Sequence, residues 1–233
     1  MASLKILSGG AAQGLVTALA PAFETETGLD HDGSFGAVGA MRARLQAGEE
    51  ADIVILTAAL IRELGEEGLV LDASARDLGT VETAIAIRSG DPRPASVADA
   101  AGLAAALKEA DAVYFPDPER ATAGIHFAKV LRSLELWEEL SGRLRPFANG
   151  ATAMRELATS DTRSPIGCTQ ATEIIITPGV TLIGPLPPGL DLRTVYTAAV
   201  GSRAARPDAA RRFVDMLLDD GRREERRSAG FGP

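Results

Sequence analysis

Three short segments of the chain combine small residues with a turn that leads into a helix. They are SGGAAQG at residues 8–14, GSFGAVGA at residues 33–40 and ERATAGIH at residues 119–126. Small residues let a ligand approach the backbone closely. The unpaired N–H groups and the dipole of a helix start favour negative charge. Any one segment is explained as well by tight chain reversal, but three in one chain predict a site for a small anion.

Each of these segments contains a hydroxyl residue, and the sequence lacks the common motifs of nucleotide-binding sites. Ser8, Ser34 and Thr122 offer hydroxyl donors. The phosphate-binding pattern G-x-x-x-x-G-K-[ST] does not occur, and GGAAQG is not followed by a dinucleotide-binding unit with an acidic residue at its usual place. We therefore expect no nucleotide ligand.

The charge and the rare residue types narrow the function further. A formal net charge of −8 argues against a nucleic-acid partner, which needs clustered Lys and Arg. The single cysteine, Cys168, excludes an internal disulfide, and two histidines leave little for a histidine-rich metal centre. We expect no metal and no cofactor.

Short apolar stretches alternate with helical patterns along the chain. The predicted strands are LKIL (4–7), ADIVIL (51–56), ETAIAI (82–87), AVYFP (112–116), SPIGC (164–168), VTLIGPLP (180–187) and TVYTAAV (194–200). Such alternation predicts a mostly parallel sheet with helices on both faces, whose ligands bind at the carboxyl ends of strands.

Helical spacing is clearest at the two ends of the chain. Leu15, Leu19 and Phe23 recur every four residues, and Gly28 stands where a C-terminal cap belongs. The last helix is predicted from about residue 207 to residue 218, followed by a solvated tail at 219–233.

The beginning of the chain predicts its location. LKIL reads as a folded strand rather than a secretion signal, and no apolar run approaches the roughly 20 residues that cross a bilayer. As written, the sequence predicts a cytoplasmic protein without membrane insertion, and a periplasmic one if a leader was removed.

Two long segments carry a family resemblance. LQAGEEADIVILTAALIRELGEEGLV (45–70) and PDPERATAGIHFAKVLRSLELWEELSGRL (116–144) resemble the molybdate-binding proteins of ABC importers, which have the type II periplasmic binding protein fold. A third segment, AMRELATSDTRSPIGCTQATEI (153–174), is similar to the family's cleft-lining segment. The similarity extends from about residue 5 to residue 213.

The resemblance implies an α/β fold of two Rossmann-like lobes with mixed sheets, joined by two hinge strands. The first lobe would comprise residues 1–82 and 196–233, and the second residues 83–195. The hinges would be VETAIAI (81–87) and TVYTAAV (194–200), and a small anion would bind between the lobes. An ABC permease would be a partner only if the protein is exported.

The resemblance also implies a set of ligand-binding residues. They are Ser8, Gly9, Gly10, Ala11, Phe35, Gly36, Ala37, Val38, Thr122, Ala123, Gly124, Asn149, Thr152, Cys168 and Gln170. The family's serines fall at Gly10 or Ala11 and at Ala37 or Val38, and its tyrosine falls at Gln170. Backbone donors such as the N–H of Ala123 are kept, but the hydroxyl groups are lost. A small carboxylate therefore fits at least as well as molybdate.

Catalysis remains an alternative, because relatives resembling aconitate isomerase use the same fold. A cytosolic isomerase of a small polycarboxylic acid needs a base beside the substrate and donors for the developing charge. Cys168, His126 and Glu173 are candidate bases, but each is explained as well by packing or by a helix-start charge, so the catalytic residues stay unknown. Arg120 fits a carboxylate clamp or an exposed loop position. A cytosolic anion sensor is a third possibility.

Overall fold

The computed structural model describes residues 3–233. The chain forms two compact units. Unit 1 comprises the chain up to Val81 together with Thr194–Pro233, and unit 2 comprises Glu82–Arg193. The chain passes between them inside strand β4 (Arg76–Arg88) and at the start of strand β9 (Arg193–Val200).

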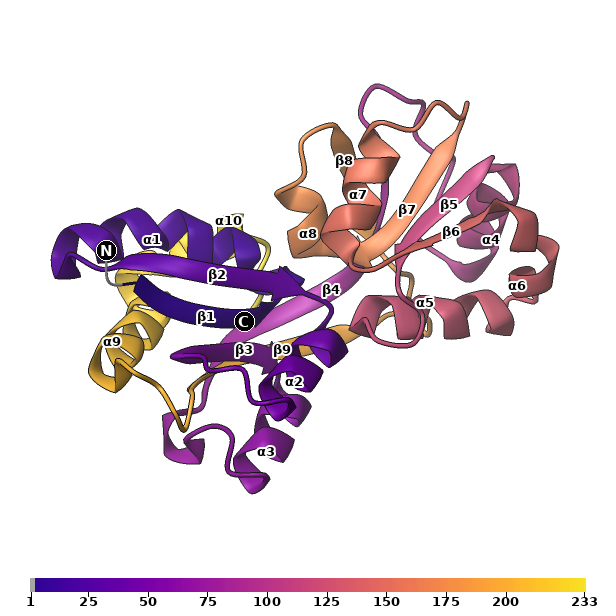
Figure 1. Ribbon diagram of the computed structural model, residues 1–233. Helices are drawn as coiled ribbons and strands as arrows, with labels where there is room; N and C mark the ends of the chain where they lie inside the picture. Colours follow the sequence, from indigo (N-terminus) through magenta and orange to yellow (C-terminus); the bar gives the residue numbers. More distant parts are fainter. Residues whose placement is uncertain (1–2) are drawn as a thin grey trace. The chain divides into compact units, whose positions relative to one another are not determined.

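The sheet of unit 1 is mostly parallel. β1 (Ser3–Gly9) lies between β2 (Asp30–Gly36) and β3 (Ile53–Thr57), and all three run in the same direction. β9 pairs with β3 in the antiparallel direction (Figure 1). β3 is buried along nearly its whole length, as expected for a strand covered on both faces.

Helices cover both faces of this sheet. They are α1 (Gln13–Thr27), α2 (Val38–Gln46), α3 (Ala58–Glu66), α9 (Pro207–Leu218) and α10 (Arg223–Ser228). The crossovers from β1 to β2 and from β2 to β3 run in opposite directions, so right-handed connections put α1 and α2 on opposite faces. α9 packs against α1 through Phe23 and Phe213, whose ring centroids are 4.9 Å apart.

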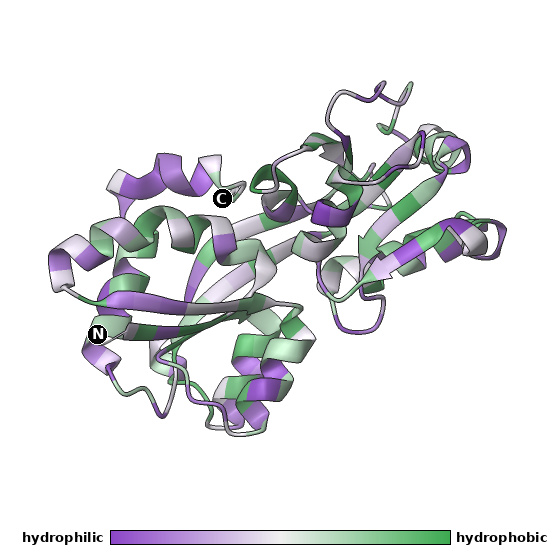
Figure 2. Ribbon diagram, turned by 45° about the horizontal axis from the view of Figure 1, so that its top comes forward, coloured by the Kyte–Doolittle hydropathy of each residue, from purple (hydrophilic) through white to green (hydrophobic). Residues whose placement is uncertain are grey.

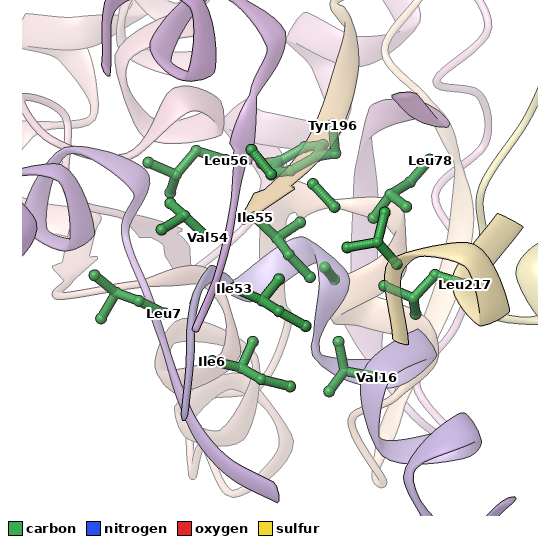
Figure 3. Packing of buried hydrophobic residues seen from close by; sticks show 14 of the residues in the cluster. Ile6, Leu7, Val16, Ile53, Val54, Ile55, Leu56, Leu78, Tyr196 and Leu217 are labelled. Carbon is green, nitrogen blue, oxygen red and sulfur yellow. The ribbon is translucent and has the colours of Figure 1, made fainter. Parts of the chain in front are cut away.

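The core of unit 1 joins the central strands to these helices. Figure 3 shows Ile6 and Ile53 beside Val16 of α1 and Leu217 of α9. The edge strand β2 differs from its neighbours, because it is polar along much of its length (purple in Figure 2). Charged residues on an edge strand hinder its pairing with another chain.

Unit 2 has a mixed sheet of its own. β5 (Ala112–Pro116) lies between β6 (Leu144–Phe147) and β7 (Pro165–Gln170), and these three strands are parallel. β4 pairs antiparallel with both β7 and β8 (Val180–Pro185). The helices are α4 (Ala100–Glu109), α5 (Thr122–Ser133), α6 (Leu136–Glu139), α7 (Gly150–Ala158) and α8 (Ala171–Ile175).

Two apolar clusters fill the faces of the second sheet. One includes Phe115 and Cys168 of the sheet with Leu103 of α4 and Phe127 of α5. The other is smaller and gathers residues of β4, β5, α7 and α8 around Met154. Short 3₁₀ turns complete the fold at Gly10–Ala12 (η1), Asp72–Ser74 (η2), Ser141–Arg143 (η3) and Asp220–Arg222 (η4).

The structure confirms the α/β fold class with mixed sheets and most of the predicted elements. The last helix spans Pro207–Leu218, and Gly28 ends α1 with a φ of 70°, in the left-handed region that glycine tolerates. In the described part of the chain, no helix is long and apolar enough to cross a membrane.

Two strands were missed in the sequence, β2 and the short β6 (Leu144–Phe147). The segment before α2 was expected to be only a glycine-rich turn, whereas Asp30–Gly36 forms β2. Ser34 consequently lies in a strand, where its hydroxyl accepts a hydrogen bond from Arg44 at 3.2 Å. A polar edge strand with two glycines carries no apolar signal, which explains the error.

The expectation of a solvated tail was wrong. α10 forms within it, and Phe231 is buried in the core of unit 1. Gly232 exchanges backbone hydrogen bonds with Thr80 of β4. A Cβ on Gly79 would overlap the Gly232 carbonyl, so the tail needs a glycine there in order to pack. Phe231 therefore packs into the core directly after a helix that is rich in Arg and Glu and has no buried residue.

Candidate functional site

The carboxyl ends of three parallel strands meet at one edge of unit 1. β1 and β2 end at Gly9 and Gly36, which are directly paired, and β3 ends beside them. Because β2 and β3 lie on opposite sides of β1, this edge is a topological switch point, where open α/β sheets bind ligands. The fold therefore brings together the two predicted segments Ser8–Ala11 and Phe35–Val38.

The start of α2 is buried and has no side-chain cap. Its N-cap residue is Ala37, and Ala37 and Val38 are each 7% exposed. The first N–H groups of a helix have no partner within it. Among the described residues no side chain caps η1 or α1 either, so this edge presents several N–H groups that suit an anion.

Glycine and serine at the end of β1 have local structural roles. A Cβ on Gly9 would lie 2.8 Å from Cγ1 of Val38 and 3.1 Å from the ring of Tyr196, so only glycine fits there. The hydroxyl of Ser8 is buried and donates to the carbonyl of Gly9 at 2.9 Å. Phe35 is half-buried against the core of unit 1. The backbone is thus the main source of donors at this edge.

Unit 2 repeats this arrangement at the end of β5. α5 begins after Ala121 without a side-chain cap, and Ala123 in its first turn is 2% exposed. A Cβ on Gly124 would overlap the carbonyls of Pro116 and Asp117, so glycine lets the helix start lie against the end of β5. Thr122, Ala123 and Gly124 therefore form a second buried, uncapped helix start.

The start of α7 is different, because the chain caps it internally. The side-chain oxygen of Asn149 accepts a hydrogen bond from the N–H of Thr152 at 2.8 Å. The hydroxyl of Thr152 accepts from Arg155 at 2.9 Å. The side-chain oxygen of Asn149 and the hydroxyl of Thr152, both predicted ligand groups, are therefore hydrogen-bonded within the start of α7. Thr57 and Asp99 cap the starts of α3 and α4 in the same way as Asn149 caps α7.

Gln170 ends β7 with a buried amide. The residue is 2% exposed, and among the described residues neither its Nε2 nor its Oε1 has a hydrogen-bond partner. Thr83 lies directly opposite on β4, and its buried hydroxyl is also without a partner, as is that of Thr172. Leaving such groups unpaired costs about 1–3 kcal/mol each, so their position suits a polar ligand.

Strand geometry relates Gln170 to α5. Side chains alternate across a strand, so Gln170 shares its face of the sheet with Cys168. Cys168 packs in the apolar cluster that includes Phe127 of α5. The amide of Gln170 and the start of α5 thus belong to the same face and the same edge of unit 2.

The remaining candidates have structural surroundings. Cys168 is fully buried, and burial raises the pKa of its thiol well above the ordinary value, which disfavours the reactive thiolate. Nε2 of His126 lies 2.7 Å from the carbonyl of Leu190, and Arg120 is exposed. Among the described residues, no group of three His, Cys, Asp or Glu side chains could hold a metal ion.

Sequence reasoning did not select Thr83. The only signal in the sequence is one hydroxyl residue inside the apolar strand ETAIAI, and its importance depends on a pairing with Gln170 across 87 positions of the chain. Nothing in a linear pattern fixes such a long-range register.

Comparisons with known proteins agree with this fold. Aconitate isomerase from Pseudomonas sp. is 26% identical over 240 residues, covering 99% of this chain and 88% of the relative. The molybdate-binding protein ModA from Escherichia coli (strain K12) is 24% identical over 186 residues, covering 78% and 70%. The solved periplasmic molybdate-binding protein of Azotobacter vinelandii superposes with a TM-score of 0.81 at 19% identity, over 99% of both chains.

The resemblance to molybdate-binding proteins with the type II periplasmic binding protein fold is thereby confirmed at the level of fold. The family model described as "Bacterial extracellular solute-binding protein" matches residues 4–232, nearly the whole chain. The protein belongs to the bacterial extracellular solute-binding protein family.

Proposed function

We propose that this protein binds small anions at buried helix starts, through backbone N–H groups of η1 and α2 in unit 1 and, together with the amide of Gln170, of α5 in unit 2. The observation that carries the proposal is the combination of burial and missing caps at these starts. Buried helix starts without side-chain caps are costly in a protein that binds nothing there. The helix dipoles make an anion the matching ligand.

Both kinds of anion named among the relatives are compatible with these donors. The names of two relatives refer to molybdate, and that of a third refers to aconitate, a carboxylate. Few hydroxyl groups support an oxyanion here, because Ser8 donates to Gly9, while Ala37 and Val38 carry none. We therefore include small carboxylates beside tetrahedral oxyanions as ligands.

We further propose that the protein works outside the cytoplasmic membrane and delivers its ligand to an ABC permease. The family description refers to extracellular solute binding, and one solved relative is named periplasmic. Both points support this location over a cytoplasmic one.

Isomerisation of a small polycarboxylic acid is the second candidate function. The likeness to aconitate isomerase covers 99% of the chain and favours it. Such a reaction needs a base that can reach the substrate. Cys168 is a poor candidate because its thiol is buried with a raised pKa, and His126 already contacts the carbonyl of Leu190.

One set of measurements separates the two functions. Purified protein is mixed with molybdate, sulfate, cis-aconitate and trans-aconitate, while thermal unfolding and ultraviolet absorbance are followed. A ligand at about 100 times its dissociation constant adds roughly 2.7 kcal/mol of stability. We expect a shift with at least one anion and constant absorbance. Turnover of either aconitate would favour the isomerase, and the absence of any shift would contradict anion binding.

A further inference from the structure

Thr83 and Gln170 form a polar pair at the end of an otherwise apolar face of the sheet in unit 2. They lie directly opposite each other on the antiparallel strands β4 and β7. Side chains that are directly opposite in such a pair project from the same face of the sheet. The proposed function uses the amide of Gln170 and assigns no role to Thr83.

The two apolar clusters of unit 2 show which face this is. Ile85 and Cys168 are the next opposed residues with the same orientation, and both belong to the cluster that includes Phe127 of α5. The alternate residues of β4 project from the other face, into the smaller cluster with α7 and α8. Thr83 and Gln170 therefore lie on the face of the sheet that α5 covers.

The strand register places this pair at the same edge as the start of α5. β5 and β7 are parallel, with Tyr114 beside Gly167, and continuing this register puts Asp117 level with Gln170. A Cβ on Gly124, in the first turn of α5, would overlap the carbonyl of Asp117. α5 also packs against β7. The uncapped helix start and the polar pair thus belong to one edge of unit 2.

Both side chains are buried with unused capacity for hydrogen bonds. Thr83 is 1% exposed and Gln170 is 2% exposed. Among the described residues, the hydroxyl of Thr83 and both polar atoms of the Gln170 amide have no partner. The next opposed residues towards the core are Ile85 and Cys168, which offer no strong donor or acceptor. Partners must therefore come from the edge where α5 starts and where the anion is proposed to bind.

The polar pair differs chemically from the helix start beside it. Backbone N–H groups only donate, whereas the amide of Gln170 offers N–H donors and an acceptor oxygen, and the hydroxyl of Thr83 can do both. Sulfate and molybdate carry no proton at neutral pH and can only accept. Such an anion satisfies the donors but leaves the amide oxygen buried and unpaired, which weakens binding. An anion with an O–H group of its own satisfies both kinds of atom.

We propose that Thr83 and Gln170 are specificity-determining residues that select anions carrying their own hydroxyl group. This inference rests on the proposed function, because it concerns the anion held at the start of α5. The charged end of the ligand accepts from the N–H groups of α5. Its O–H group donates to the amide oxygen of Gln170 and accepts from the hydroxyl of Thr83. Hydroxycarboxylates and protonated phosphate share this chemistry.

Calorimetric titration of the full chain near neutral pH with matched pairs of anions tests this selection. Both enantiomers of malate are compared with succinate, citrate with propane-1,2,3-tricarboxylate, and phosphate with sulfate. The first member of each pair carries an O–H group that the second lacks. We expect at least one first member to bind about tenfold or more tightly than its counterpart. A preference among the carboxylates assigns the site to hydroxycarboxylates, and a preference confined to phosphate assigns it to protonated phosphate.

Variants of the polar pair connect this preference to the two side chains. Thr83→Val removes the hydroxyl and keeps nearly the same shape. It is expected to reduce the preference about threefold or more without lowering the urea midpoint, because the hydroxyl has no partner to lose. Thr83→Ser keeps a hydroxyl and is expected to keep the preference. Gln170→Leu removes the acceptor and is expected to abolish the preference.

Thr169→Val is the matched control on the opposite face of β7. The hydroxyl of Thr169 is buried and donates to the buried carboxyl of Glu173 at 2.5 Å. Thr169→Val is therefore expected to lower the urea midpoint and to keep the preference for anions with a hydroxyl group. This pattern is the reverse of the one expected for Thr83→Val, so the two variants separate selection from stability.

Distinct results would overturn the selection and the binding itself. Molybdate and the two aconitates are titrated alongside, as anions without a hydroxyl group. Equal affinities within every pair, or a preference that Thr83→Val leaves unchanged, would overturn the selection alone. Binding of sulfate, molybdate or an aconitate with no binding of any hydroxyl-bearing anion would do the same. A wild type that binds none of these anions would contradict the proposed function as well.

Discussion

Gln170 combines burial with an amide that has no partner at either end among the described residues. Replacing it with leucine removes two unpaired polar atoms from the interior, which is neutral or stabilising. We therefore expect Gln170→Leu to keep or raise the free energy of unfolding while weakening anion affinity by about tenfold or more. Urea denaturation and calorimetric titration measure the two effects.

A matched control exists on α2. Gln46 is exposed and donates to Glu67 at 2.8 Å, so Gln46→Leu is expected to leave anion affinity unchanged. If Gln170→Leu destabilised the protein strongly without changing affinity, its amide would have a structural role instead.

Cys168 was a candidate catalytic base in the sequence, but its surroundings indicate a packing role. Its thiol is fully buried in the apolar cluster, and burial raises its pKa. We expect a thiol reagent to modify it slowly in the native protein and rapidly in denaturant. The half-time of modification, measured by absorbance, checks this. Rapid native labelling that a bound anion suppresses would return Cys168 to the ligand site.

Glu173 also predicts how stability depends on pH. Its pKa in the folded state is raised from 4.5, so the folded protein holds the proton more tightly than the unfolded chain. This contribution to stability is complete below the unfolded pKa and is lost as pH rises through the folded one. Glu173→Gln is expected to flatten this part of the pH profile in denaturant titrations. An unchanged difference between pH 4 and pH 8, roughly, would contradict the raised pKa.

At the scale of elements, helix starts divide into capped and uncapped ones. α3, α4 and α7 are capped by Thr57, Asp99 and Asn149, whereas α2 and α5 begin after alanine. Capping residues are readable in a sequence, but their absence becomes informative only when the structure shows that the start is buried.

Proline at the first position of α5 tests whether this start binds the ligand. Thr122→Pro removes one N–H and one hydroxyl, and proline is tolerated there because Ala121 has an extended conformation. We expect stability to change little and anion affinity to fall at least about tenfold. Ala100→Pro at the capped start of α4 is the control. Equal affinities for both variants would exclude α5 as a donor.

The C-terminal segment makes a prediction about stability. Phe231 is 5% exposed within the core of unit 1. Truncating such a residue leaves a cavity, so Phe231→Ala is expected to lower the free energy of unfolding by about 3 kcal/mol. Urea denaturation measures the change. A loss below about 0.5 kcal/mol would support the solvated tail that the sequence suggested.

Elements with strong periodicity were predictable, and elements defined by long-range contacts were not. ADIVIL and AVYFP could be read as buried strands because both faces are covered. β2 was missed because an edge strand needs no apolar residues. The burial of Phe231 was missed because it depends on a long-range β-bridge between Thr80 and Gly232. The same limit applies to the site. The glycine-rich turns before the uncapped helices could be recognised in the sequence, but the pairing of Thr83 with Gln170 across β4 and β7 could not.

At the scale of the whole molecule, each unit offers its own donors at the carboxyl edge of its parallel strands. Unit 1 offers η1 and α2, and unit 2 offers α5 and Gln170. Binding of a small anion by such buried helix starts is the central claim about the molecule's function.

Calorimetric titration of wild type and Thr122→Pro with molybdate, sulfate and the two aconitates tests that claim most directly. We predict saturable binding of at least one of these compounds, weakened by Thr122→Pro and unaffected by Ala100→Pro. The absence of saturable binding in the wild type, or equal affinity in all three proteins, would contradict the account.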